Sequence, residues 1–425
     1  MNVKWLKFSD QKIIIILLGL IFLNYFGIFI SYNGFFKLFF SYIIIGSFLI
    51  CLFIINKKNF EIKLLLIVLL ILSLGSPSFH YDARWIWLFK GKQFFINNNL
   101  EFLKEEYLIN SIWQSYPLLG PSLAASIANF FGYWNEIFPK VFNIILATPG
   151  LIYLASIFEK KLNKLLFIFL TLFILEKSII IGEMDGLLSI YFTVTFLVIY
   201  KIFFNNNIFL NNKDNFLFSK NKKFNIFFLI LSLMCMTLLK KESLVLLSII
   251  IFSLFLCKYF FKDNKIDYKN FVFLIISLIP LVFWEIYLIK NEILVSNHGS
   301  ISNLFNEDFK LFSKLFDFKS ILLINSKIFL NKGFFIAFLF MSFVFGFLYS
   351  LLKKIKNDKK IKGFILYFMI IFISYIGFYN FIYLITSYDL VWHLKVSAGR
   401  IALPISFLTS IVALVLIEKY FTTTK

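Results

Sequence analysis

The sequence has little of what a soluble protein needs on its surface. Charged residues make up only 16% of the 425 residues, whereas 60% are hydrophobic. A soluble domain of this length carries many more polar residues. Apolar stretches such as 13–32, 36–55 and 271–289 recur along the chain, and each can cross a hydrocarbon core of about 30 Å as a helix. The composition therefore excludes a soluble domain and predicts a polytopic integral membrane protein.

Cysteines and the signature motifs of soluble enzymes are also scarce or missing. The three cysteines, Cys51, Cys235 and Cys257, lie inside apolar runs, where they indicate small buried side chains and no disulfide framework or metal site. The sequence has no GxGxxG, P-loop, GxSxG, HExxH or CxxC pattern. It also lacks the ATP-binding domain that a nucleotide-powered pump needs, and no internal repeat is visible.

Basic residues predict the topology of the chain. The formal net charge is +20, and in a membrane protein such an excess marks cytoplasmic loops, so we expect no nucleic acid partner. We place the N-terminus inside, and we expect the first apolar run to be retained, because it is long for a signal peptide and lacks a small-residue cleavage site. The lysine-rich loops 57–63, 160–164, 220–223, 262–269 and 353–362 then all face the cytoplasm.

The expected fold is an all-α bundle in which residues 1–425 form a single transmembrane domain with about twelve spans. The spans are expected near 13–31, 36–55, 63–78, 140–157, 165–181, 187–204, 225–240, 243–260, 271–289, 334–352, 363–387 and 401–418.

Two long loops are expected on the outer side, at 79–139 and 290–333. Within the first loop, 117–133 is apolar enough to cross, but counting it as a span would turn every later basic loop outward. We therefore predict a helix there that lies at the outer interface or dips partway in, and Pro117, Pro121 and the flanking Trp113 and Trp134 suit such an interfacial element.

Asp82 is the first candidate for chemistry. It directly follows the third expected span, next to aromatic residues that lower the local dielectric constant, and these conditions suit a general base or a metal ligand. The alternative is that Asp82 pairs with Arg84 or ends a helix at the water boundary.

A second acidic feature is the turn Gly182–Gly186, which contains Glu183 and Asp185. Two carboxylates one residue apart can face one site, as a divalent cation such as Mg²⁺ or Mn²⁺ requires. Acidic residues also occupy such turns as caps of the next helix. The pair gains weight because it is expected on the same side of the membrane as Asp82.

Cationic candidates lie on the same expected face. Lys240 interrupts an apolar region and can hold a phosphate at headgroup level or simply belong to a solvated turn. Arg400, just before the last expected span, allows the same two interpretations, and arginine binds two phosphate oxygens at once. The other candidates on this face are His80, Lys90 and His393.

Seven short patterns occur in a particular order along the chain. An Asp-centred stretch at 81–87 is followed by the Lys-Gly-Lys of 90–92, and a Tyr-Pro-Leu-Leu-Gly-Pro element at 116–121 precedes Phe-Gly at 131–132. The acidic turn, the Lys-Lys-Glu-Ser turn at 240–243 and an Arg-Ile-Ala-Leu-Pro element at 400–404 follow. This order resembles the GT-C superfamily of membrane glycosyltransferases, which includes protein mannosyltransferases and aminoarabinose transferases. In this chain Ser243 stands where Gly is commoner, and more than one expected span precedes the Asp82 loop, where one is usual.

The resemblance implies a glycosyltransferase in the inner (plasma) membrane that uses a polyprenyl-phosphate-linked sugar donor and acts at the periplasmic or outer face. It implies Asp82 as the base that accepts the proton of an acceptor hydroxyl on a glycan, lipid or protein. Arg84, Lys240 and Arg400 would neutralise the departing lipid phosphate. Glu183 and Asp185 would orient the acceptor or help to bind a divalent cation, as in some relatives.

Two other classes stay open. An O-antigen polymerase or ligase also has about a dozen helices and a late outer loop with Arg and His; the loop 290–332 contains His298 but no Arg. A lipid or sugar transporter usually has duplicated halves and ionisable residues near the bilayer midplane, which this sequence does not show.

Overall fold

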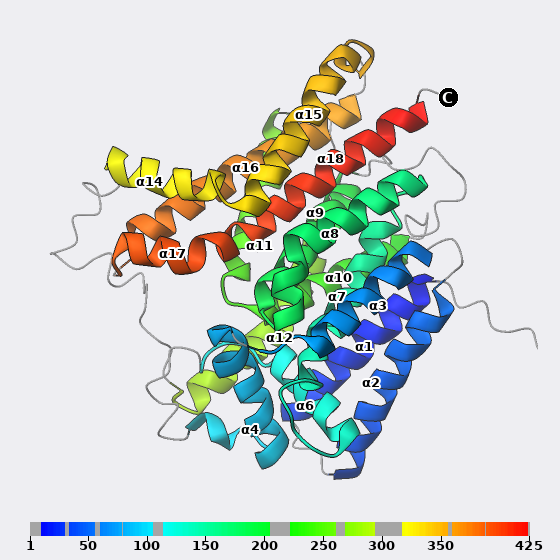
Figure 1. Cartoon of the computed structure of the whole chain (residues 1–425), viewed down its shortest axis with the longest axis vertical. Coiled ribbons are helices and arrows are strands. Elements are labelled where there is room, and N and C mark those ends of the chain that lie inside the picture. Colours follow the sequence, from blue (N-terminus) through cyan, green and yellow to red (C-terminus); the bar gives the residue numbers. More distant parts are fainter. Residues whose placement is uncertain are drawn as a thin grey trace, which may run out of the picture.

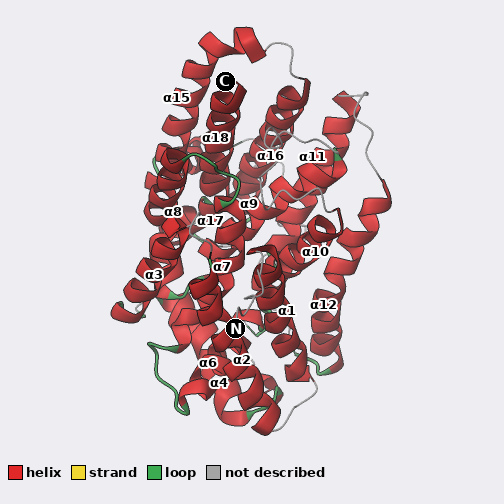
Figure 2. Cartoon of the chain, turned by 90° about the vertical axis from the view of Figure 1, so that its right-hand side faces the viewer, coloured by secondary structure: helices red, strands yellow, loops and turns green. Residues whose placement is uncertain are grey.

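The chain folds into a bundle of helices. In this computed structural model, the structure describes residues 10–29, 34–55, 60–78, 80–104, 114–204, 222–260, 268–293, 317–355, 359–386 and 388–423. Within these ranges the regular elements are all helices, and no strand occurs (Figure 2). An all-α fold is therefore confirmed for the part of the chain that the structure describes.

The elements follow one another in a simple order (Figure 1). They are α1 (Asp10–Phe29), α2 (Gly34–Ile54), α3 (Phe60–Gly75), η2 (Asp82–Leu88), α4 (Phe89–Asn97), η3 (Glu101–Lys104), α6 (Leu119–Phe131), η4 (Pro139–Val141), α7 (Phe142–Ala155), α8 (Lys161–Ile181), α9 (Met184–Phe203), α10 (Lys222–Leu239), α11 (Ser243–Phe260), η5 (Tyr268–Asn270), α12 (Phe271–Lys290), α14 (Phe318–Phe329), α15 (Lys332–Ile355), α16 (Lys359–Leu384), α17 (Leu390–Ile401) and α18 (Leu403–Thr423).

Seven of the described helical stretches are long and apolar enough to cross a membrane, or up to eight if the bent pair α14 and α15 counts as one span. The seven are Lys12–Phe29, Lys37–Ile54, Met184–Phe203, Ser243–Phe260, Phe271–Lys290, Ile361–Leu384 and Leu390–Lys419. The other expected spans also fall on helices, but α3 and α7 have only 16 and 14 residues, and α8 carries charged residues near both ends. The count of twelve spans is therefore not confirmed and stays a prediction.

Helix α9 forms the centre of the bundle. All of its residues are buried, and it packs against α7, α8, α10 and α18 (Figure 1). The outer helices α2, α12 and α16 instead leave many apolar side chains exposed, as expected for helices that face lipid. The turns that connect the helices around α9 therefore lie close to one another, next to the first residues of α9.

Helix α6 lies where we expected an interfacial helix, but it is buried. It packs against α1, α2, α4 and α7, and the Ser126 hydroxyl donates a hydrogen bond to Asn24 Oδ1 at 2.9 Å. A Cβ atom at Gly120 would lie 2.0 Å from Met184 Cε and 3.0 Å from Phe142 Cε2, so α6 approaches its neighbours closely at this glycine. The helix at 119–131 therefore supports the interior of the bundle.

Lysines gather at the far ends of the central helices. Lys161 begins α8, Lys201 lies in the last turn of α9, and Lys258 lies in the last turn of α11. The turns α8–α9 and α10–α11 are at the opposite ends of these helices. A helix of about 20 residues spans about 30 Å, so the lysines and the two turns lie on opposite sides of the bundle.

Candidate functional site

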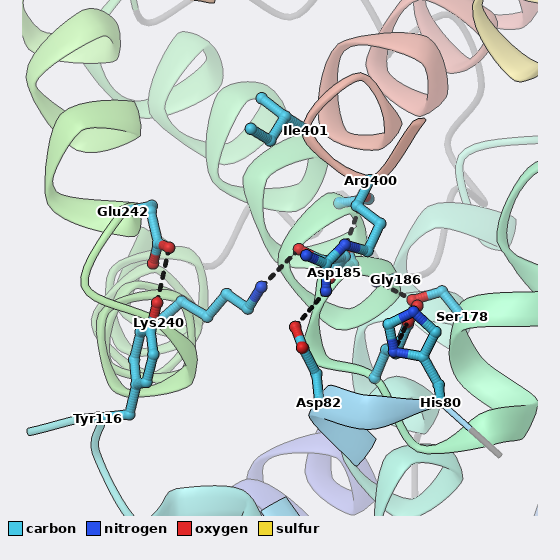
Figure 3. A network of polar contacts seen from close by, with 12 residues as sticks. His80, Asp82, Tyr116, Ser178, Asp185, Gly186, Lys240, Glu242, Arg400 and Ile401 are labelled. Carbon is cyan, nitrogen blue, oxygen red and sulfur yellow. Dashed lines mark hydrogen bonds and ion pairs between the residues drawn. The ribbon is translucent and has the colours of Figure 1, made fainter. Parts of the chain in front are cut away.

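Charged side chains from four distant parts of the chain meet at one site (Figure 3). They come from the segment that begins η2, the α8–α9 turn, the α10–α11 turn and the last turn of α17. We call this set the charged cluster. It consists of His80, Asp82, Glu183, Asp185, Lys240 and Arg400.

Asp82 and Arg400 form the first ion pair of the charged cluster. The Nη1 of Arg400 donates a hydrogen bond to Asp82 Oδ2, across 318 residues of sequence. Both side chains are largely buried. The Nε of Arg400 is also buried and has no hydrogen-bond partner among the described residues. Arg400 therefore keeps one donor that can serve a bound anion.

Lys240 and Asp185 form the second pair. Lys240 Nζ lies 2.7 Å from Asp185 Oδ1, and the two side chains are only 10% and 9% exposed. Burial opposes the charge on Lys240, yet the carboxylates of Asp185 and Glu242 outweigh it and raise the pKa of Lys240 above its usual value. Lys240 is therefore a cation that its carboxylate neighbours hold in the site.

Glu183 completes the α8–α9 turn and pairs with His80. Glu183 Oε1 lies 2.6 Å from His80 Nδ1. Gly182 ends α8 with a φ of +93°, a left-handed conformation that glycine adopts without steric cost. The Asn143 side chain donates a hydrogen bond to the Glu183 carbonyl at 2.9 Å, and Gly186 N donates one to Ser178 Oγ at 2.8 Å. These contacts fix the turn, so that its two carboxylates face the charged cluster.

Tyr116 and Glu242 extend the polar contacts beyond the charged cluster (Figure 3). The Tyr116 hydroxyl donates a hydrogen bond to Glu242 Oε1 at 2.8 Å. Burial, with the charge of Glu242 adding to it, raises the pKa of Tyr116 well above its usual value, so the phenol stays a donor. The sequence indicates Tyr116 only as part of the Tyr-Pro-Leu-Leu-Gly-Pro element, and no sequence pattern connects it with a glutamate 126 residues away.

Lys90 supports the segment that carries Tyr116. Its Nζ donates hydrogen bonds to the carbonyls of Gln114 and Tyr116, both at 3.2 Å, and its side chain is buried. Trp284 Nε1 donates a third bond to the Ser115 carbonyl at 3.0 Å. Lys90 was one of our outer-face candidates, and in the structure it binds the backbone carbonyls of Gln114 and Tyr116.

Two further candidates make their contacts outside these pairs. Arg84 lies 3.6 Å from Glu136, and about half of each side chain is exposed. The ring of His393 packs against Tyr383, with the ring centroids 4.9 Å apart. The structure therefore brings six of our nine candidates together and directs Arg84, Lys90 and His393 to other partners.

The residues of the charged cluster do not fit a divalent cation in this arrangement. Among the described residues, no group of three or more His, Cys, Asp or Glu side chains could hold a metal ion. Asp82, Asp185 and Glu183 each face a side chain that is cationic or can become so. A dication would have to displace these partners, and we assign it no step.

Lys90 provides a pH-dependent test of this region. Burial, with the charge of Lys241 adding to it, lowers the pKa of Lys90 to about 7, against about 10.4 in an unfolded chain. Between these two pKa values Lys90 carries a proton in the unfolded chain but not in the folded chain, so the free energy of unfolding rises with pH. Below about pH 7 Lys90 is charged in both states, and the cost of burying its charge is present in full. We expect the thermal midpoint of the wild type to rise relative to that of Lys90→Met between about pH 7 and pH 10. A constant difference, equal to that for the exposed Lys92→Met, would contradict the lowered pKa.

No protein-family model, curated protein or solved structure matches this chain. The function must therefore be argued from the charged cluster itself. A carboxylate that can accept a proton lies beside two cations that can bind an anion, at the end of a helix bundle with lipid-facing flanks. This arrangement suits proton abstraction coupled to the departure of an anionic group.

Proposed function

We propose that this chain is a GT-C-type membrane glycosyltransferase that transfers a sugar from a polyprenyl-phosphate-linked donor to an acceptor hydroxyl. The observation that carries the proposal is the contact between Asp82 and Arg400 next to the Lys240–Asp185 pair. It joins a candidate base with candidate phosphate ligands. The acceptor is a glycan, a lipid or a protein side chain.

Asp82 serves as the general base. Its carboxylate accepts the proton of the acceptor hydroxyl while the oxygen attacks the anomeric carbon of the donor sugar. The bond between that carbon and the phosphate oxygen breaks at the same time, and the electron pair leaves with the polyprenyl phosphate. Attack opposite the leaving group inverts the anomeric configuration.

Arg400 and Lys240 stabilise the leaving phosphate, where negative charge develops in the transition state. The guanidinium of Arg400 binds carboxylate and phosphate in the same way, so a donor phosphate competes with Asp82 for it. When Arg400 turns to the phosphate, Asp82 becomes available to the acceptor. Arg84 has no part in this scheme because it pairs with Glu136.

The geometry also favours one side of the membrane. The charged cluster lies at the ends of α8, α9, α10 and α11 opposite to the lysine-rich ends. Because lysines mark the cytoplasmic side, we infer that the site faces the periplasm or the cell exterior. In a plasma membrane, a polyprenyl donor would present its phosphate there at headgroup level.

The test is sugar transfer by the purified chain in vesicles. We expect a labelled sugar to move from a polyprenyl-phosphate donor to a membrane acceptor, with inverted configuration in the product, and no transfer from a nucleotide-linked sugar. Absence of any transfer would reject the proposal. Lengthening of a lipid-linked glycan would then indicate a polymerase or ligase, and movement of the intact donor across the vesicle membrane would indicate a transporter.

A further inference from the structure

Two short helices lie outside the central bundle, side by side at the end where Arg400 is found (Figure 1). They are α14 and α17, and both pack against α16. An aspartate caps the N-terminus of each helix: Asp317 accepts hydrogen bonds from Lys319 N and Ser320 N, and Asp389 accepts one from Trp392 N. Such caps define where a helix begins.

Helix α14 is divided along its length into three strips. Ile324 and Ile328 are buried against the bundle. Phe318, Leu322 and Phe329 follow the helical repeat on a neighbouring strip, where Phe318 is 73% and Leu322 is 70% exposed. Lys319, Ser326 and Lys327 are exposed on the remaining side. A helix with adjacent apolar and cationic strips suits a boundary between lipid and water.

Exposed apolar side chains occur on α15 as well as on α14. The two helices meet at a bend of 77°. Asn331 caps α15 there, accepting hydrogen bonds from Gly333 N and Phe334 N at 3.1 and 3.3 Å. Beyond the bend, Phe335, Leu339 and Phe343 are exposed. The chain therefore changes direction at a capped bend, and apolar side chains are exposed on both sides of the bend.

Helices α17 and α18 together are longer than a membrane requires. The stretch Leu390–Lys419 has 30 residues, which is about 45 Å of helix against a hydrocarbon core of about 30 Å. The excess corresponds to α17. Its Trp392 is 51% exposed, and Val396 one turn later is also exposed, while Arg400 follows at the next turn and reaches Asp82. Tryptophan is enriched at the membrane boundary.

We propose that α14 and α17 form an amphipathic platform that lies in the headgroup region of the leaflet on the side of the charged cluster. The occupant of its exposed apolar surface is the phospholipid boundary: Phe318, Leu322 and Trp392 enter the acyl region, and Lys319 and Lys327 face the lipid phosphates. The platform holds Arg400 at headgroup depth. This inference does not depend on the reaction that the charged cluster performs.

The test measures the depth of single nitroxide labels in the full chain, reconstituted in vesicles of phosphatidylethanolamine and phosphatidylglycerol. The labels are attached at Leu322→Cys, Ser326→Cys and Phe343→Cys. The chain without these substitutions provides the blank, because its three native cysteines are buried. Accessibility to oxygen reports lipid, and accessibility to a water-soluble nickel complex reports water.

We expect the label at 322 to be accessible to oxygen at a shallow depth, about 5–10 Å inside the boundary. The label at 326 should be accessible to nickel, and the label at 343, about 16 Å along α15 from Lys332, should lie near the bilayer centre. Nickel accessibility at 322 equal to that at 326 would place α14 in water and overturn the proposal. A depth at 322 equal to that at 343 would show that α14 is half of a bent span, which also overturns it.

Discussion

Replacing Asp82 by asparagine is expected to lower the rate of sugar transfer by about 10²- to 10⁴-fold, because a general base contributes a factor of this size. Asparagine has almost the same shape and still accepts a hydrogen bond from Arg400, but it cannot take up the proton of the acceptor hydroxyl. The base acts only as the transition state forms. The variant should therefore lose kcat and kcat/KM equally, with little change in KM for the donor.

Arg84→Gln is the matched control for this experiment. Arg84 lies two residues after Asp82, but its side chain pairs with the half-exposed Glu136. We expect the control to retain transfer within about twofold, since an exposed ion pair contributes little to stability. Undiminished transfer by a folded Asp82→Asn variant would remove Asp82 from the chemistry. Equal losses in both variants would indicate damage to the segment that begins η2.

The length of the apolar runs predicts the fold better than the finer sequence patterns do. Each of the expected spans coincides with a helix because long apolar runs have to satisfy their own backbone hydrogen bonds. The burial of α6 against other helices was not expected from the sequence. Prolines and tryptophans around 117–133 suggested an interface, whereas Gly120, Ala124 and Ala125 are the small residues through which membrane helices pack closely. That signal was present in the sequence and favoured the interior.

The charged cluster could be predicted as a set of residues but not as a set of pairs. Ionisable residues in an apolar chain are costly unless they are paired or reach water, so the ends of expected spans were informative about Asp82, Asp185 and Lys240. The partner of Asp82 depends on how α17 packs against the rest of the bundle. Proximity in sequence suggested Arg84, and the structure uses Arg400, the other of the two arginines among 43 basic residues.

The buried pairs also explain how so many charges can share one site. Each buried charge alone would carry a large desolvation cost, which a partner at hydrogen-bond distance offsets. Lys240 has Asp185 at 2.7 Å, and Arg400 has Asp82. A bound phosphate would replace a carboxylate as the partner of a cation, so each cation keeps an anionic partner throughout. The arrangement is thus suited to partner exchange.

Replacing Lys240 by methionine is expected to lower the free energy of unfolding by about 3 kcal/mol, because breaking a buried ion pair leaves its other charge uncompensated. The carboxylate of Asp185, only 9% exposed, would lose the ammonium at 2.7 Å. We take the lower end of the usual range because Arg400 also acts on Asp185. Unfolding in mixed micelles measures the loss, and the exposed Lys92→Met serves as the reference.

A second substitution separates stability from function. Combining Lys240→Met with Asp185→Asn removes both charges, so the double variant should regain about 1–2 kcal/mol relative to Lys240→Met, since contacting residues couple by this amount. Transfer should stay low in both, because the phosphate loses one of its two cations and no neutral side chain replaces it. If the double variant recovers transfer together with stability, Lys240 has only a structural role, and the leaving phosphate depends on Arg400 alone.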